Sequence, residues 1–274
     1  MEDKRPLLCI AGKNRIAADV LEHLANESNR LVALPIESDS GKDTWQPSFR
    51  KKASELDVRI VSLDSCKSAD DLIFLSLEYD KLIRPNEFAS QKLYNLHFSL
   101  LPAYKGCFTS IWPIVNGEEK SGVTLHVVNQ GIDTGSIVEQ VEIPIRSTTT
   151  ARELYDLYQD FGTRLIINSV ATLLSGEFES SHQKPTGSSY FSRSSLSNLD
   201  FEINTRQTAF QISCFVRGVF FPEFQTATFK GQSLKSAKVS REASIEPPGT
   251  VIFEDSNVFC LSTIDYDIVL EKFS

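Results

Sequence analysis

Short apolar runs alternate with helically spaced apolar residues through the first half of the chain. Residues 7–12 read as a buried strand, and the apolar positions that follow recur at helical spacing, which predicts a helix capped by Asn14. A second helix is expected at residues 47–56 after a polar loop, and the remaining runs predict strands at residues 31–36, 58–63, 72–77 and 93–98. This alternation is typical of an α/β fold with a mostly parallel sheet and crossover helices.

The pattern then changes to a period of two. Residues 122–128 and 137–145 each alternate apolar and polar positions, which predicts two strands joined by a turn over residues 129–135. Thr150 and Glu153 have the spacing of a capping box, and the apolar residues after them keep a helical period up to Gly176. We therefore expect a long amphipathic helix between these points.

The composition changes again after this helix. The next stretch is rich in serine, contains Pro185 and Gly187 and has no sustained period, as in a linker. Short strands are expected beyond it, at residues 226–229, 250–253 and 258–263. We therefore divide the chain into a main α/β domain, a linker and a small, mostly β C-terminal domain, at residues 1–178, 179–198 and 199–274.

Composition and charge disfavour several classes of protein. Of the 274 residues, 41% are hydrophobic and 23% are charged, and the apolar run after the charged residues 1–6 is too short for a signal peptide or a membrane span. Five cysteines without a CxxC pair predict neither a disulfide framework nor a zinc site, and they favour reduced thiols in the cytoplasm. The net charge of −8 disfavours nucleic acid as a partner, and we expect no association with a membrane.

Candidate chemistry is concentrated at three polar residues. Asn95 and His97 are two positions apart in a predicted strand, so both side chains point to one face. An amide donor beside a histidine can stabilise an oxyanion and move a proton. Asp133 lies in a turn between glycines, where its carboxylate could orient the imidazole and raise its pKa. The same residues also fit an ordinary strand histidine and a turn former, so spacing alone leaves both interpretations open.

The ordered surroundings of these residues resemble the folate-dependent formyltransferases. The resemblance rests on Asn95-x-His97-x-Ser99-Leu-Leu-Pro102, Gly106, Pro113-Ile114 before Gly117, Gly122-Val-Thr and Asp133-x-Gly135. It is close over residues 70–145 and looser over the preceding sheet. It implies a Rossmann-like formyltransferase domain, in a family whose members act on methionyl-tRNA, glycinamide ribonucleotide or nucleotide-linked sugars.

The resemblance also implies a role for each of the three residues. Asn95 would hydrogen-bond the formyl oxygen, His97 would stabilise the developing oxyanion and take part in proton transfer, and Asp133 would pair with His97 and help to deprotonate the attacking amine. The formyl donor would be 10-formyltetrahydrofolate, and no metal is implied. Leu77 and Tyr79, together with Asp133, are the expected folate-binding residues, although a packed aromatic explains Tyr79 equally well.

Charge narrows the choice of formyl acceptor. Residues 190–274 carry eight Lys and Arg against ten Asp and Glu, a net of −2, which argues against a tRNA-binding domain. A domain after Gly176 is not expected in the glycinamide-ribonucleotide enzymes. The loops at residues 12–14, 45–48 and 104–114 resemble those of sugar N-formyltransferases. The resemblance implies a dTDP-linked amino sugar for O-antigen or other surface polysaccharide: dTDP-4-amino-4,6-dideoxyglucose, with a 3-amino-3,6-dideoxyhexose as the alternative and methionyl-tRNA a weaker one.

The candidates for binding the nucleotide sugar are polar or aromatic residues near predicted turns: Lys13, Asn14, Glu78, Lys105, Tyr190, Arg217 and Phe221. The first two open a helix that could face the pyrophosphate, but a cap explains Asn14 as well. Lys105 also fits a solvated loop lysine, and the aromatic residues and Arg217 could stack a base and pair a phosphate or pack in a core. A homodimer is expected from the strand edges of a small β domain. A sugar-binding module without catalysis is a further alternative, which the three intact polar residues disfavour.

Overall fold

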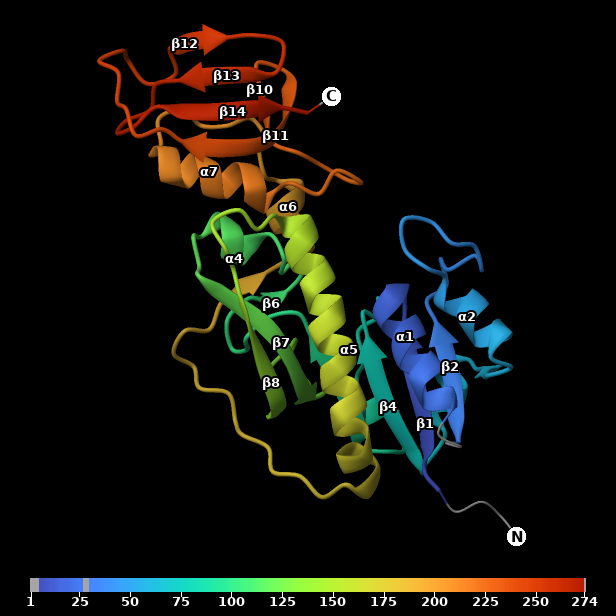
Figure 1. Cartoon of the computed structure of the whole chain (residues 1–274). Coiled ribbons are helices and arrows are strands. Elements are labelled where there is room, and N and C mark those ends of the chain that lie inside the picture. Colours follow the sequence, from blue (N-terminus) through green and yellow to red (C-terminus); the bar gives the residue numbers. More distant parts are fainter. Residues whose placement is uncertain (1–4, 27–29, 274) are drawn as a thin grey trace. The chain divides into compact units, whose positions relative to one another are not determined.

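The computed structural model describes residues 5–26 and 30–273 (Figure 1). Residues 1–4 of the charged N-terminal segment lie outside the described residues. The chain forms two compact units: the first comprises the residues up to Lys105, Gly122–Glu142 and Leu157–Tyr190, and the second comprises Gly106–Ser121, Ile143–Asp156 and the residues from Phe191 onward.

A sheet of seven strands, in the order β3-β2-β1-β4-β5-β7-β8, carries the first unit. Its strands are β1 (Leu7–Gly12), β2 (Leu31–Pro35), β3 (Arg59–Ile60), β4 (Leu72–Leu77), β5 (Lys92–His97), β7 (Lys120–Val127) and β8 (Ile137–Pro144). The first five strands in this order, β3-β2-β1-β4-β5, pair in parallel, whereas β7 runs antiparallel to β5. The predicted α/β fold with a mostly parallel sheet is confirmed. The strand expected at residues 58–63 is shorter than predicted because a helix begins at Leu63.

Helix α1 (Asn14–Ala25) follows β1, and its buried face is entirely apolar. The predicted cap is wrong: Lys13 occupies the N-cap without a side-chain hydrogen bond, and Asn14 has a left-handed φ of 62°. Instead, the Arg15 amide donates to Gln46 Oε1 at 3.1 Å and the Ile16 amide donates to Gln159 Oε1 at 2.9 Å. Two distant glutamines therefore supply the acceptors that a local cap would supply.

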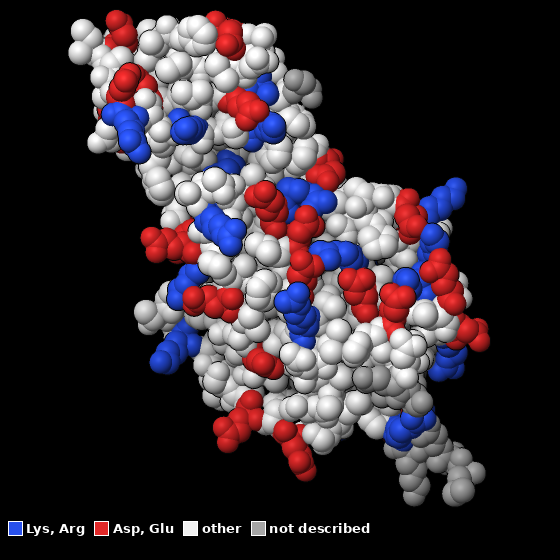
Figure 2. Space-filling model, viewed as in Figure 1, with Lys and Arg blue, Asp and Glu red and all other residues white. Residues whose placement is uncertain are grey.

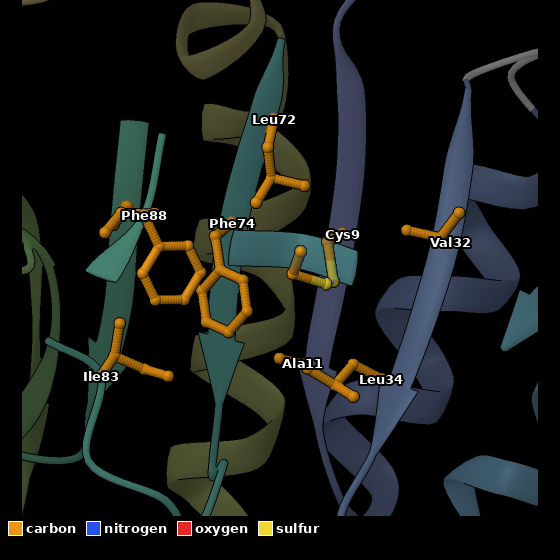
Figure 3. Close-up of a cluster of buried hydrophobic side chains, with 10 residues drawn as sticks. Cys9, Ala11, Val32, Leu34, Leu72, Phe74, Ile83 and Phe88 are labelled. Atoms are coloured by element: carbon orange, nitrogen blue, oxygen red, sulfur yellow. Dashed lines mark hydrogen bonds between the residues drawn. The ribbon is translucent and has the colours of Figure 1, made fainter. Parts of the chain in front are cut away.

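The other helices of the first unit are α2 (Phe49–Glu55), α3 (Leu63–Lys67) and a short 3₁₀ turn η1 (Pro85–Glu87). A hydrophobic cluster on one face of β1, β2 and β4 contains Phe74, Phe88 and Leu34 (Figure 3). Cys9 and Cys66 belong to the same cluster, with their Sγ atoms 3.6 Å apart. All five cysteines are free thiols in the structure.

The long helix α5 (Ala151–Ser175) has the predicted start and end. The Thr150 amide donates to Glu153 Oε2 at 2.9 Å, and the Glu153 amide donates to Thr150 Oγ1 at 3.2 Å, so the capping box is present. Gly176 follows with φ 74°, a conformation that favours glycine and ends the helix.

The stretch predicted to be a linker contains short elements. Strand β9 (Tyr190–Phe191) pairs with β6 (Lys105–Gly106), and helix α6 (Arg193–Ser197) begins at a capping box formed by Ser192 and Ser195. Pattern analysis missed these elements because two-residue strands and a five-residue helix are too short to show a period.

Within the second unit, the residues predicted as a small C-terminal domain, 199–274, are mostly β, as expected. Its five-stranded antiparallel sheet has the order β10-β11-β14-β13-β12, and helix α7 (Ala209–Gly218) packs against β11 (Figure 1). The strands are β10 (Thr228–Phe229), β11 (Gln232–Val239), β12 (Val251–Glu254), β13 (Val258–Leu261) and β14 (Ile268–Lys272). Helix α7 also packs against α4 (Trp112–Val115). Helix α7 and strands β11 and β14 were not predicted from the sequence.

Among the described residues, no helix combines the length and apolar character needed to cross a membrane. The face of the molecule in Figure 2 carries acidic and basic side chains interspersed with one another.

Candidate active site

Four polar side chains meet where β5 and β7 lie side by side and where the loop after β7 returns. Asn95 and His97 come from β5, His126 comes from β7, and Asp133 comes from the loop between β7 and β8. The structure therefore brings together the three residues predicted from the sequence and adds His126. His97 and His126 are only 7% and 3% exposed, so the interactions among these groups are weakly screened by water.

The register of β5 against β7 explains why three of these side chains lie together. Asn95 is directly opposite His126 in the antiparallel pair, and His97 is opposite Thr124. Residues opposite each other in such a pair have side chains on the same face, and so do residues two apart in one strand. Asn95, His97 and His126 consequently share one face of the sheet.

Backbone carbonyls fix the orientation of both histidines. His126 Nδ1 lies 2.9 Å from the Val127 carbonyl oxygen, which can only accept, so Nδ1 carries the proton. In the neutral ring His126 Nε2 is then an acceptor, and Asn95 Nδ2 donates to it at 3.1 Å. This bond orients the Asn95 amide and leaves the second N–H of Nδ2 for another acceptor.

His97 faces two different groups through its two ring nitrogens. His97 Nε2 donates to the Tyr104 carbonyl oxygen at 2.8 Å, and Nδ1 lies 3.5 Å from Asp133 Oδ2. Burial lowers the pKa of His97 below its ordinary value of 6.5, while the Asp133 charge and the bond to Tyr104 oppose this shift. The expected effect of Asp133 on the pKa is present, but desolvation outweighs it.

Asp133 is held in a tightly bent loop. Its own φ is 53°, in the left-handed region that non-glycine residues rarely adopt, and its Oδ1 lies 3.6 Å from His126 Nε2. Two residues later, a Cβ atom on Gly135 would overlap the Val127 carbonyl, so only glycine lets the loop approach β7 this closely. The carboxylate thus lies between the two histidines.

Asn14 and Glu78 meet at the ends of two neighbouring parallel strands. Asn14 Nδ2 donates to Glu78 Oε2 at 3.3 Å, and Glu78 also has a left-handed φ, of 57°. The pair follows β1 and β4, where the strand order of the sheet reverses, and in open α/β sheets ligands bind outside the carboxyl ends of the strands at such a point. The register of β4 against β5 ends with Leu77 opposite Leu96, so Glu78 and His97 each come directly after the last paired residues. The bonds from the Arg15 and Ile16 amides to glutamines, however, already use two donors of the helix start that a phosphate would need.

The predicted folate-binding residues differ in how they are placed. Leu77 is fully buried in β4, and its carbonyl oxygen accepts from the Lys13 amide at 3.3 Å. Tyr79 packs against the cluster of Figure 3, with its ring edge-on to Phe74 at a centroid distance of 6.2 Å. Burial, and then the neighbouring Asp80 charge, raise the pKa of Tyr79 to about 12, so its hydroxyl stays protonated at neutral pH.

Lys105 and Tyr190 lie on the two paired strands β6 and β9. Lys105 Nζ donates to Ser188 Oγ at 3.0 Å, and the Tyr190 side chain is half exposed. Both side chains are therefore accessible or weakly bound, as a ligand contact would require.

Arg217 and Phe221 lie in the second unit, in packed surroundings. Arg217 is 8% exposed, and its Nη1 donates to the Thr149 carbonyl oxygen at 3.0 Å, which ties α7 to the segment before α5. Phe221 is buried against Tyr155 and Phe224, with centroid distances of 5.6 and 5.3 Å. Within this unit, both side chains contribute to packing.

His126 was not among the site residues predicted from the sequence. It occupies an inward position of the period-two run at residues 122–128, two residues after Thr124, which was the signal available. Its pairing with Asn95 depends on strand register, which the run alone does not reveal. In the described part of the chain, no three His, Cys, Asp or Glu side chains are grouped so that they could hold a metal ion.

This arrangement suits acyl transfer to an amine. A fixed amide donor can stabilise a developing oxyanion, and a carboxylate beside an imidazole can accept and hand on a proton. The chain belongs to the formyl transferase family, which its sequence matches over residues 19–170. It is a formyltransferase, as the resemblance predicted.

Two solved structures are similar to the whole chain. WlaRD, a sugar 3N-formyl transferase crystallised in the presence of dTDP and 5-N-formyl-THF, has a TM-score of 0.91 and 36% identity, covering 99% of this chain and 99% of its own. The N-formyltransferase from Helicobacter canadensis, in complex with folinic acid and dTDP-3-aminofucose, has a TM-score of 0.90 and 35% identity, covering 97% of this chain and 99% of its own. Among curated relatives, the methionyl-tRNA formyltransferase of Clostridioides difficile (strain 630) is 27% identical over 281 residues, 95% of this chain and 89% of that protein.

Proposed function

We propose that the enzyme transfers the formyl group of 10-formyltetrahydrofolate to the 3-amino group of a dTDP-linked 3-amino-3,6-dideoxyhexose. The observation that carries this proposal is the likeness over nearly the whole chain to two enzymes, one described as a sugar 3N-formyl transferase and one bound to dTDP-3-aminofucose. The proposal therefore takes position C3 of the sugar in place of C4, the position expected from the sequence. A role in surface-polysaccharide synthesis remains part of the proposal.

The catalytic cluster supports a direct transfer. The unprotonated amine attacks the formyl carbon, and the second N–H of Asn95 donates to the oxygen that gains charge. Asp133, whose Oδ2 lies 3.5 Å from His97 Nδ1, takes the proton that the amine loses. When the bond from the formyl carbon to N10 of the folate breaks, N10 receives the proton that Asp133 took, so the carboxylate is regenerated and the site ends in its starting protonation state.

The strand ends are the proposed place for the two substrates. Glu78 directly follows β4 at the carboxyl end of that strand, where a carboxylate can attract the amino group of the sugar. Leu77 and Tyr79 would contact the folate mainly through backbone groups, because their side chains are committed to the core. Lys13, Lys105 and Tyr190 remain the candidates for the nucleotide.

The test is a transfer assay with two matched acceptors. The purified protein, with 10-formyltetrahydrofolate, should convert dTDP-3-amino-3,6-dideoxygalactose to a product heavier by one CO. With dTDP-4-amino-4,6-dideoxyglucose, kcat/KM should be lower by about 10²-fold, because an amine displaced by an ångström or more is poorly oriented for attack. His97→Asn, which preserves a polar side chain of similar size, should fold and lose most activity.

Other outcomes would each redirect the assignment. Faster turnover of the 4-amino sugar would restore C4 as the acceptor position. Formation of formyl-methionyl-tRNA without any sugar product would sink the nucleotide-sugar proposal. Full activity of His97→Asn would contradict the catalytic assignment.

A further inference from the structure

The segment after α5, residues 181–189, runs along both loops that carry catalytic groups; we call it the strap. At one end, Gln183 Nε2 donates to the carbonyl oxygens of Asp133 and Gly135, each at 2.8 Å. The neighbouring Ser181 forms a two-way backbone bridge to Ile137, the first residue of β8. The strap thus holds the Asp133 loop from outside.

At its other end the strap holds the loop that orients His97. The Tyr104 amide donates to Ser189 Oγ at 2.8 Å, and the Lys105 amide donates to the Ser189 carbonyl oxygen at 2.9 Å. The carbonyl oxygen of the same Tyr104 accepts the bond from His97 Nε2. Tyr104 is therefore the one residue that links Ser189 to the His97 imidazole through hydrogen bonds.

Both contacts fall on residues with unfavourable backbone conformations. Asp133 and Tyr104 have φ values of 53° and 57°, and neither is glycine. Such conformations persist only where surrounding contacts impose them, and they are common at functional sites. Gln183 forms a hydrogen bond with the backbone of Asp133, and Ser189 forms one with the backbone of Tyr104.

The chemistry of Gln183 supports a specific role. Because both of its partners are carbonyl oxygens, only the NH₂ end of the amide can face them. Its Oε1 is then buried with no hydrogen-bond partner among the described residues. Because a buried oxygen without a hydrogen bond is costly, the two bonds that Gln183 Nε2 donates must maintain this orientation of the amide.

We propose that Gln183 and Ser189 are positioning residues of the formyl-transfer site, which they set by holding the backbone of Asp133 and of Tyr104. This inference rests on the proposed role of Asp133 and His97 in formyl transfer. It also gives a catalytic purpose to a stretch whose composition suggests only a linker.

Kinetics of matched variants test the proposal. Gln183→Met keeps the shape of the side chain but has no donor, and it should lower kcat by about tenfold with little change in KM, as expected for the loss of a hydrogen-bonded restraint. Ser189→Ala should act similarly, whereas Ser189→Thr keeps the hydroxyl and should retain activity. Lys184→Ala, an exposed change in the same strap, is the control and should match the unmodified enzyme.

A second readout needs no acceptor and therefore separates this inference from the proposed function. The charges of Asp133, His126 and Lys105 act on the pKa of His97, and the Asp133 charge raises it. If Gln183→Met loosens the Asp133 loop, the His97 titration observed by NMR in the free protein should move to lower pH. A purely structural role would lower the melting temperature and leave this titration in place.

An unchanged kcat together with an unchanged His97 titration in Gln183→Met would overturn the proposal. If that variant does not fold, as judged by circular dichroism, the comparison of Ser189→Ala with Ser189→Thr decides, and equal kcat values for the two would also overturn it. Should the unmodified enzyme formylate no dTDP-amino sugar, the proposed acceptor fails, while the titration still tests the strap.

Discussion

Two histidines share one carboxylate in this site, and each has a separate task. His126 donates from Nδ1 to a carbonyl and accepts from Asn95, so it orients the amide that is proposed to donate to the formyl oxygen. His97 Nδ1 lies 3.5 Å from Asp133 Oδ2, and the Asp133 charge raises the pKa of the His97 ring against the effect of burial. Neither task can be assigned from the residue types alone, because an imidazole can donate, accept or do both.

The balance between burial and the Asp133 charge leads to a prediction for His97. Its pKa in the folded protein should lie below 6.5, and it should fall further in Asp133→Asn, which removes the charge that favours the imidazolium. Titration of the His97 ring by NMR in both proteins measures this. A His97 pKa above 6.5, or one that rises in Asp133→Asn, would contradict it.

The same shift has a consequence for stability. The unfolded chain binds the His97 proton more readily than the folded one, so the stability from a neutral His97 is complete above the ordinary pKa of 6.5 and is lost as the pH falls toward the folded value. In His97→Asn this contribution to acid sensitivity should be absent.

At the scale of elements, the sequence predicted what local patterns encode. The bounds of β1 and β4, the capping box of α5 and its end at Gly176 all follow from short-range signals. Helix α7 and strand β14 were missed, although the spacing of Thr208 and Gln211 is that of the capping box that begins α7.

The site was predicted only in part for a similar reason. Asn95, His97 and Asp133 lie in a recognisable motif, whereas His126, Gln183 and Ser189 act through strand register or through backbone carbonyls. A contact from an amide to a carbonyl places almost no constraint on the sequence around it. Asn14 was misjudged as a cap because its partner, Glu78, is 64 residues away.

The loop after β7 can be tested as an element by comparing two glycine substitutions. Gly135→Ala puts a methyl group into the Val127 carbonyl, so the loop must move and carry Asp133 with it. We expect kcat to fall by about 10²-fold, since small displacements of catalytic groups are costly. Gly176→Ala is the matched control, because it strains a positive φ in open space at the end of α5. It should cost about 1 kcal/mol of stability and leave kcat unchanged. Equal kcat values for the two variants would refute this account of the loop.

At the scale of the whole molecule, the distribution of charged side chains bears on which formyl acceptor the enzyme can bind, a tRNA or a small nucleotide. The chain carries 28 basic and 36 acidic residues, and the face in Figure 2 shows both signs intermixed. Nucleic-acid binding draws on clustered basic side chains that displace counterions from the phosphates. A formyltransferase with this charge distribution is better suited to a small nucleotide, which needs one or two cations at a defined place. A homodimer and a cytoplasmic location remain predictions.

We therefore expect no salt-sensitive binding of initiator methionyl-tRNA. In a gel-shift or fluorescence titration at about 50 mM salt, where electrostatic binding of nucleic acid is strong, the protein should bind dTDP but not tRNA. Raising the salt to about 200 mM should barely change the dTDP affinity, because few charges take part, whereas a protein making many phosphate contacts would lose about 10³-fold or more. Tight tRNA binding at low salt that disappears at high salt would show that a basic surface exists despite the net charge of −8, and it would return methionyl-tRNA to consideration as the acceptor.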